Sequence, residues 1–139
     1  PSTPSVRTNA SISQAAAVAA LTGPQDFLED RNAVFKKRRD MVVAMLNDAP
    51  GLDCPTPEGA FYVFADCSGM IGKRTPAGDV IANDTDAATY LLREGRVAGV
   101  PGAAYGVEPY VRFSLATSET LLEQALIQLA EATSKLTNA

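Results

Sequence analysis

The sequence contains no histidine and only two cysteines among its 139 residues. Without histidine, Ser-His-Asp and Cys-His catalysis are excluded, and so are most zinc sites. Cys54 and Cys67 are too few for a disulfide framework in a chain of this length, so both thiols are expected to be reduced. We therefore predict no metal site and no disulfide.

Long apolar runs and an excess of positive charge are also missing. No run of about 18 or more apolar residues occurs, so no membrane span is predicted. The formal net charge of −4 argues against nucleic acid, whose phosphates bind basic patches. A hydrophobic content of 46% with 20% charged residues is typical of a globular protein with a real core. We expect one cytoplasmic globular domain, or part of one.

Apolar periodicity and glycine or proline breakers predict four helices and a small sheet. The expected helices are 14–21, 24–47, 86–94 and a last one that starts at Thr117 or Ser118 and runs to about Ala132. The expected strands are 59–65, 97–100 and 110–115. Residues 66–85 are expected to form a long surface loop, and the tail 133–139 to fray. This order predicts an α+β fold, with a small mixed sheet of about three strands packed with helices.

Local signals mark where these helices begin and end. They are a cap at Ser11 or Ser13, Pro24 in a first turn, a cap at Asp84 or Thr85, and Gly95 as a stop. The second helix, 24–47, is about 35 Å long at 1.5 Å per residue, which is enough to span two domains. Its basic run, Lys36–Arg39, is either an anionic docking patch or a solvated helix face, and the second interpretation is favoured.

Arg112 is the one charged residue in the strand-like run Tyr110–Ala116. Burying an arginine in a sheet costs free energy unless an anion pairs with it. A guanidinium presents a planar fork that matches a carboxylate at two points. The glycine-rich turn Pro101–Gly106 precedes this strand and could open a pocket beside it. Arg112 is therefore predicted either to form a structural ion pair or to anchor an acidic ligand.

Four sequence blocks occur in an order and spacing that resemble one enzyme family. The blocks are SISQAAAVAAL at Ser11–Leu21, PEGAFYVF at Pro57–Phe64, VAGVPGAAYG at Val97–Gly106 and YVRFSLATS at Tyr110–Ser118. Together they resemble the C-terminal part of the fold-type-I PLP-dependent aminotransferases, close to the bacterial aspartate aminotransferases. The resemblance implies an aminotransferase small domain at 23–139 that includes one long interdomain helix. It also implies that 1–22 is a linker and short helix that pack on a large domain.

The same resemblance implies substrate-binding roles for two residues. Arg112 falls at the family's arginine that binds the α-carboxylate of the substrate. Phe61 resembles an aromatic residue that lines the substrate pocket in some members, although a core position in a strand explains it equally well. The family's PGSAFG-like turn at the mouth of the site is here PGAAYG, Pro101–Gly106, which lacks the serine hydroxyl and adds that of Tyr105.

This sequence departs from the family by lacking the motifs that hold the cofactor. The family's Schiff-base lysine and its cofactor-binding groups lie upstream of the first block, and without them PLP has no anchor. We therefore expect no catalytic, cofactor-binding or metal-binding residue here, no bound PLP and no activity of the chain alone. The implied parent is a homodimeric, PLP-dependent transaminase that moves an amino group from an aspartate-like amino acid to a 2-oxo acid.

Two other hypotheses remain open from the residues alone. One is a non-catalytic module that uses Arg112 to bind a carboxylate or a partner. The other is a structural domain without a ligand.

Overall fold

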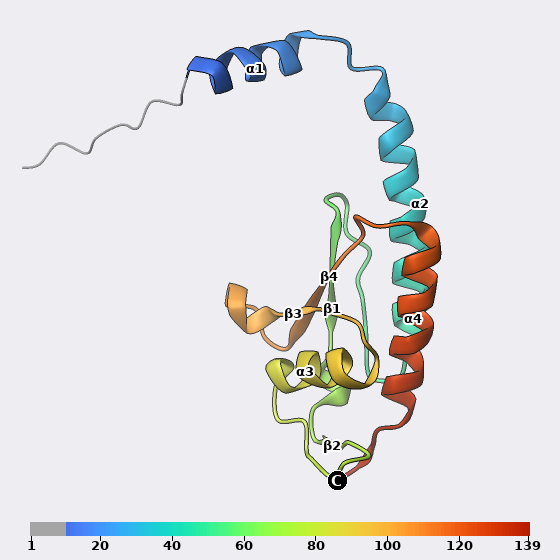
Figure 1. Cartoon of the computed structure of the whole chain (residues 1–139). Coiled ribbons are helices and arrows are strands. Elements are labelled where there is room, and N and C mark those ends of the chain that lie inside the picture. Colours follow the sequence, from blue (N-terminus) through green and yellow to red (C-terminus); the bar gives the residue numbers. More distant parts are fainter. Residues whose placement is uncertain (1–10) are drawn as a thin grey trace, which may run out of the picture. The chain divides into compact units, whose positions relative to one another are not determined.

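The computed structural model describes residues 11–139, so most of the predicted linker lies outside the described residues (Figure 1). These residues fall into two compact units that divide between Ala33 and Val34. No helix within the described range is both long and apolar enough to cross a membrane.

The first unit contains α1 (Ser11–Thr22) and the beginning of α2 (Phe27–Asp48). Alanine dominates α1 and has the highest helix propensity, which explains why this segment is helical. Both predicted helices are confirmed, with shifted ends. Ser13 lies inside α1 instead of capping it, and Pro24 lies before α2 instead of in its first turn.

The second unit is organised around a three-stranded sheet with the order β1-β4-β3. Its strands are β1 (Tyr62–Asp66), β3 (Val100–Pro101) and β4 (Tyr110–Ser114). The α+β class and the three strands are confirmed, but the sheet is antiparallel throughout and not mixed. A connection as short as the turn between β3 and β4 permits only antiparallel pairing. β4, which carries Arg112, is therefore the central strand.

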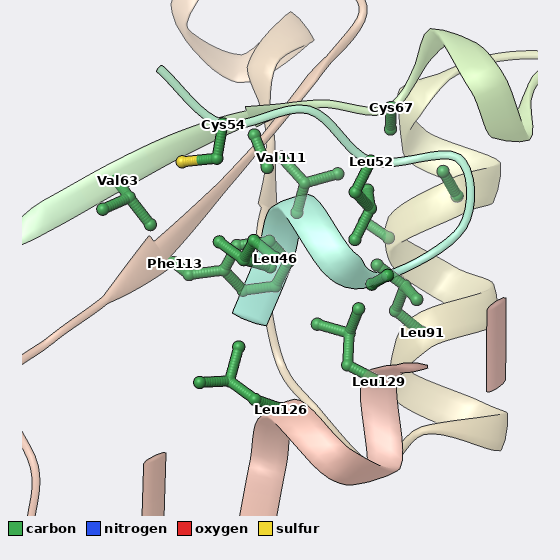
Figure 2. Packing of buried hydrophobic residues seen from close by; sticks show 14 of the residues in the cluster. Leu46, Leu52, Cys54, Val63, Cys67, Leu91, Val111, Phe113, Leu126 and Leu129 are labelled. Carbon is green, nitrogen blue, oxygen red and sulfur yellow. The ribbon is translucent and has the colours of Figure 1, made fainter. Parts of the chain in front are cut away.

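Helices cover one face of this sheet. They are the second half of α2, α3 (Asp84–Glu94) and α4 (Glu119–Ser134). Buried and half-buried residues alternate along β1 and β4, so each strand turns every second side chain toward the helices. Figure 2 shows the resulting core, in which helix residues meet strand residues: Leu46, Leu91, Leu126 and Leu129 against Val63, Val111 and Phe113. The opposite face of the sheet carries the remaining side chains, including Arg112.

The segment 66–85 is not the structureless loop that the sequence suggested. It contains a 3-10 turn at Ser68–Met70 and the strand β2 (Lys73–Arg74). β2 pairs with β5 (Thr137–Asn138), so the prediction of a frayed tail is wrong. The Lys73 ammonium also donates a hydrogen bond to the Asn138 side chain at 2.6 Å. Two-residue strands carry no periodic signal, and this pairing joins distant parts of the chain.

The ends of α3 and α4 follow ordinary capping chemistry. The Asn83 side chain caps α3 by accepting a hydrogen bond from the Asp86 N–H, so the predicted caps Asp84 and Thr85 are wrong by one position or two. Gly95 ends α3, as predicted, and the Ser118 side chain caps α4.

The basic run on α2 makes contacts within the second unit. Lys37 forms an ion pair with Glu119 at 2.6 Å, and this hydrogen bond raises the pKa of Lys37. Arg39 binds the side chain of Asp40 and the carbonyl of Pro57. Lys37 is highly exposed, so its pair contributes little to stability. Lys36 and Lys37 are exposed, whereas Arg38 and Arg39 are half-buried, so only part of the run is a solvated helix face.

Both cysteines are free and buried, which confirms the prediction of unpaired thiols. Burial raises the pKa of Cys54 to about 11, with a smaller contribution from Asp53. Burial, aided by the charges of Asp84 and Asp66, raises the pKa of Cys67 to about 12. Only the thiolate reacts readily with alkylating reagents.

We predict slow thiol modification in the folded protein. At pH 8 a thiol with a pKa of about 11 is ionised in about one molecule in a thousand, so native alkylation should be at least about tenfold slower than in urea. Counting thiols in urea without a reductant should give two per chain. A count of zero, or equal native and denatured rates, contradicts this prediction.

Candidate functional site

Arg112 lies at the centre of the sheet, on the face that the helices leave uncovered. In the register it stands opposite Phe64 of β1 on one side and Val100 of β3 on the other. Its sequence neighbours Val111 and Phe113 point into the core, and strand alternation therefore turns Arg112 to the other side. The apolar strand that marked this residue in the sequence is thus a core strand that carries one outward-facing cation.

Two tyrosine rings contact the Arg112 guanidinium. The guanidinium carbon lies 4.2 Å from the ring centre of Tyr62 and 4.6 Å from that of Tyr105. Tyr62 comes from β1, while Tyr105 comes from the 3-10 turn η2 (Gly102–Tyr105) between β3 and β4. Such cation–π contacts are worth about 0.5–2 kcal/mol each, depending on how far water is excluded. These rings orient the arginine without neutralising its charge.

No carboxylate of the described chain pairs with Arg112. The ion pairs among residues 11–139 join Lys37 to Glu119 and Arg39 to Asp40. Arg112 is half-buried, and the one fully buried side-chain nitrogen without a partner in this range is Nε of Arg38, so the unpartnered Arg112 nitrogens keep some contact with solvent. The structural ion pair considered from the sequence is therefore absent from the described residues, and the Arg112 fork is free to meet a ligand.

Phe61 lies immediately before β1 and is not a core residue. Its side chain is 45% exposed, and its ring packs 4.2 Å from that of Tyr62, centre to centre. Its carbonyl accepts a hydrogen bond from the Leu115 N–H at 2.8 Å, which extends the pairing of β1 with the chain after β4. Phe61 therefore lies next to one of the two tyrosines that contact Arg112. Its role in a substrate pocket stays a prediction.

The turn that carries Tyr105 is tightly constrained. A Cβ atom on Gly102 would lie 1.8 Å from the carbonyl oxygen of Val107, so this position admits only glycine. Gly106 ends the turn with φ at 71°, in the left-handed region that glycine adopts readily. The Ala103 N–H donates to the Asp84 carboxylate at 2.9 Å. Asp84 begins α3 and is 1% exposed, so a buried acid ties this turn to a helix.

Sequence reasoning missed three members of this arrangement. Tyr62 and Tyr105 were parts of quoted motifs, but nothing in the sequence placed their rings on Arg112. Asp84 was noted as a cap, whereas its carboxylate binds the turn η2. A buried acid near a glycine-rich turn is recognisable only once the two segments are placed together.

Two cavities in the second unit lie away from Arg112. One, of about 310 Å³, is lined by the loop after β2 and by α3. The other, of about 280 Å³, is an apolar groove lined by α2, α4, the segment before β3 and the end of β4. Neither is lined by Arg112, Tyr62 or Tyr105, so the candidate site is not either of these cavities.

The lysines of the described chain lie on other elements than this site. Lys36 and Lys37 are on α2, Lys73 is in β2 and Lys135 follows α4. Within residues 11–139 no cluster of three or more histidine, cysteine, aspartate or glutamate side chains could hold a metal ion. The described residues thus offer a fixed cation for an anionic ligand, and no lysine beside it to bind an aldehyde cofactor.

Comparisons with known proteins are consistent with one another. Residues 3–129 match the family model for "Aminotransferase class I and II". The aspartate aminotransferase of Rhizobium meliloti (strain 1021) is 56% identical over 126 residues, which are 91% of this chain and 31% of that protein. The aspartate/prephenate aminotransferase of Cereibacter sphaeroides is 50% identical over 119 residues, 86% of this chain and 30% of that protein.

Solved structures show the same relationship. The crystal structure of the aspartate aminotransferase from Rhizobium meliloti superposes with a TM-score of 0.87 at 54% identity, covering 92% of this chain and 32% of that one. An alanine aminotransferase from Pyrococcus furiosus gives a TM-score of 0.74 at 28% identity, covering 86% of this chain and 28% of that one. The chain therefore spans about a third of the length of the relatives it matches.

Proposed function

Because this chain belongs to the class I and II aminotransferase family, we propose that it is the C-terminal, substrate-closing part of a PLP-dependent aminotransferase. The whole enzyme transfers an amino group from an aspartate-like amino acid to a 2-oxo acid. The support for this substrate class is the identity of 56% and 50% with aspartate and aspartate/prephenate aminotransferases.

The observation that carries the proposal is the half-buried guanidinium of Arg112, which has no ion-pair partner among the described residues. In the proposed complex it binds the substrate's α-carboxylate through two parallel hydrogen bonds, which fixes the substrate's orientation. Tyr62 and Tyr105 hold the guanidinium from two elements. Phe61, exposed beside Tyr62, is the proposed apolar neighbour of the substrate. Closure of this part over the substrate excludes water and strengthens the ion pair.

The rest of the polypeptide has to supply the cofactor site. PLP, when bound there, supplies the electron sink for the amino-group transfer. In this proposal residues 23–139 form the small domain, and residues 1–22 pack on the large domain. Ile12, Val18 and Leu21 of α1 are exposed apolar side chains, which favours a covering surface elsewhere in the protein. The parent is proposed to be a cytoplasmic homodimer.

We predict that the 139-residue chain alone does not bind PLP covalently. Of its lysines, Lys37 pairs with Glu119 and Lys73 bonds to Asn138, and none lies on the elements that carry the Arg112 site. The measurement is PLP titration with borohydride reduction and mass spectrometry, with free lysine at equal concentration as the control for non-specific adducts. One stoichiometric adduct on a single lysine contradicts the assignment of the cofactor site to the rest of the polypeptide.

A further inference from the structure

We propose that Tyr105 is a positioning residue for Arg112, and that Asp84 fixes Tyr105 in place by anchoring the turn η2. This inference rests on the proposed function, in which Arg112 binds the substrate carboxylate. In this inference the turn η2 does more than connect β3 and β4. It also sets the direction of the Arg112 guanidinium.

The first reason is that aromatic rings are the side-chain contacts that hold the head of Arg112. No hydrogen bond or ion pair to another described residue fixes it, and a long arginine side chain otherwise samples many rotamers. The backbone position of Tyr62 is set by the sheet, because Tyr62 belongs to β1, which pairs with the strand of Arg112. Tyr105, at 4.6 Å, is the contact that depends on the turn. A bidentate bond needs a fixed plane, so the second ring matters for the geometry.

The second reason is that Tyr105 is itself supported. Its ring meets that of Phe64 at 5.9 Å between centres and at 80°, an edge-to-face arrangement that aromatic pairs favour. Phe64 is the residue directly opposite Arg112 in the register. Phe64 therefore lies beside the arginine and also supports the Tyr105 ring that contacts it. Tyr105 is nevertheless 45% exposed, and its place therefore depends on the backbone of its turn.

The third reason is the way that backbone is anchored. Asp84, buried at the start of α3, accepts the Ala103 N–H at 2.9 Å, two residues before Tyr105. A carboxylate at a helix N-terminus is stabilised by the helix dipole, so this acceptor is well placed. Inside the turn, the Val107 N–H donates to the Gly102 carbonyl at 3.0 Å. Asp84 thus connects the core helix α3 to the ring over Arg112.

A double-mutant cycle in the complete aminotransferase that contains this chain tests the proposal. The variants are Tyr105→Leu, Tyr105→Phe, Arg112→Lys and the double variant Tyr105→Leu/Arg112→Lys, each assayed for kcat/KM with aspartate as the amino donor. We expect Tyr105→Leu to lower kcat/KM about tenfold, which corresponds to ~1.4 kcal/mol. Tyr105→Phe keeps the ring and should stay within about twofold of the wild type. PLP affinity should not change in either variant.

The decisive result is the double variant. If Tyr105 acts through Arg112, the double variant loses no more activity than Arg112→Lys alone, because the effects of two mutations on the same interaction are not additive. Additive losses, a silent Tyr105→Leu, or a Tyr105→Phe as impaired as Tyr105→Leu each overturn the positioning role. A silent Arg112→Lys overturns the proposed function itself, so the two failures are distinguishable.

Asp84 is tested in the same assay with a conservative pair of variants. Asp84→Asn keeps an acceptor oxygen for the Ala103 N–H and should retain most activity, whereas Asp84→Ala removes it and should match Tyr105→Leu. Combining Asp84→Ala with Tyr105→Leu should add no further loss. If Asp84→Ala does not fold, hydrogen exchange of the Ala103 N–H in the wild type is the second measurement: slow exchange supports the anchor, and exchange as fast as that of a solvent-exposed amide overturns it. A large loss in Asp84→Asn overturns the anchoring role.

Discussion

Arg112→Lys is expected to lower kcat/KM with an amino-acid donor by roughly 10²-fold or more in the complete enzyme that contains this chain. Lysine keeps the charge but loses the planar fork that grips both carboxylate oxygens. A charge-assisted bidentate pair is worth about 2–5 kcal/mol where water is excluded, judged from the cost of truncating one partner. Lysine also loses the flat face that stacks on the rings of Tyr62 and Tyr105.

A matched control is available in the same chain. Arg31 of α2 also lies over an aromatic ring, with its guanidinium carbon 5.0 Å from the centre of Phe27, and it is exposed. Arg31→Lys should leave kcat/KM unchanged, because Arg31 belongs to the first unit, and every residue of the proposed site belongs to the second. PLP affinity should be equal in both variants. Near-equal kcat/KM values for wild type and Arg112→Lys would falsify the assignment of the carboxylate site.

Arg112 could be found from the sequence because its signal is local. A single charged residue in a strand of alternating core residues must face away from the core. That pattern can be recognised in the sequence over four or five positions. The contacts of Arg112 with the two tyrosines could not be predicted from the sequence. The position of Tyr62 over Arg112 follows from the register of β1 against β4, and that of Tyr105 follows from the path of η2. Register and turn path are set by long-range packing.

The secondary structure shows the same difference between local signals, which the sequence reveals, and long-range pairing, which it does not. Helices with sustained periodicity were located, and α4 ends within two residues of its predicted boundary. β2 and β5 were missed because two residues show no period and their partners lie far apart in the sequence. The buried Asp84 was assigned to a cap for a related reason. The cap is a local signal, whereas the bond from its carboxylate to Ala103 spans the whole of α3 and β3.

The sequence resemblance implies a substrate-binding role for Arg112, and the position of this residue in the fold supports that proposal. A guanidinium on the central strand of an antiparallel sheet moves with the whole sheet, since β1 and β3 pair with β4 on both sides. Any closure of this part carries the arginine as a rigid unit. Its orientation within that unit is then left to side-chain contacts, and these depend on the turn η2.

Gly102→Ala is expected to lower the free energy of unfolding of the 139-residue chain by about 1–3 kcal/mol, the usual cost of inserting atoms where none fit. The added Cβ would meet the Val107 carbonyl oxygen at 1.8 Å and the Tyr110 carbonyl oxygen at 3.0 Å. Both are backbone atoms, so no side-chain rotation relieves the overlap. The turn η2 has to shift, and the hydrogen bond from Ala103 to Asp84 is strained or lost with it.

Gly59→Ala is the matched control, because a Cβ there meets no atom within 4 Å. It should leave the free energy of unfolding unchanged or raise it by about 0.4–1 kcal/mol, since alanine reduces the entropy of the unfolded chain. Urea denaturation followed by circular dichroism measures both variants against the wild type. In the complete enzyme, Gly102→Ala should also lower kcat/KM, because the displaced turn takes Tyr105 away from Arg112. If the two glycine variants are equally stable, the turn is softer than its contacts indicate, and it cannot hold a ring in place over the arginine.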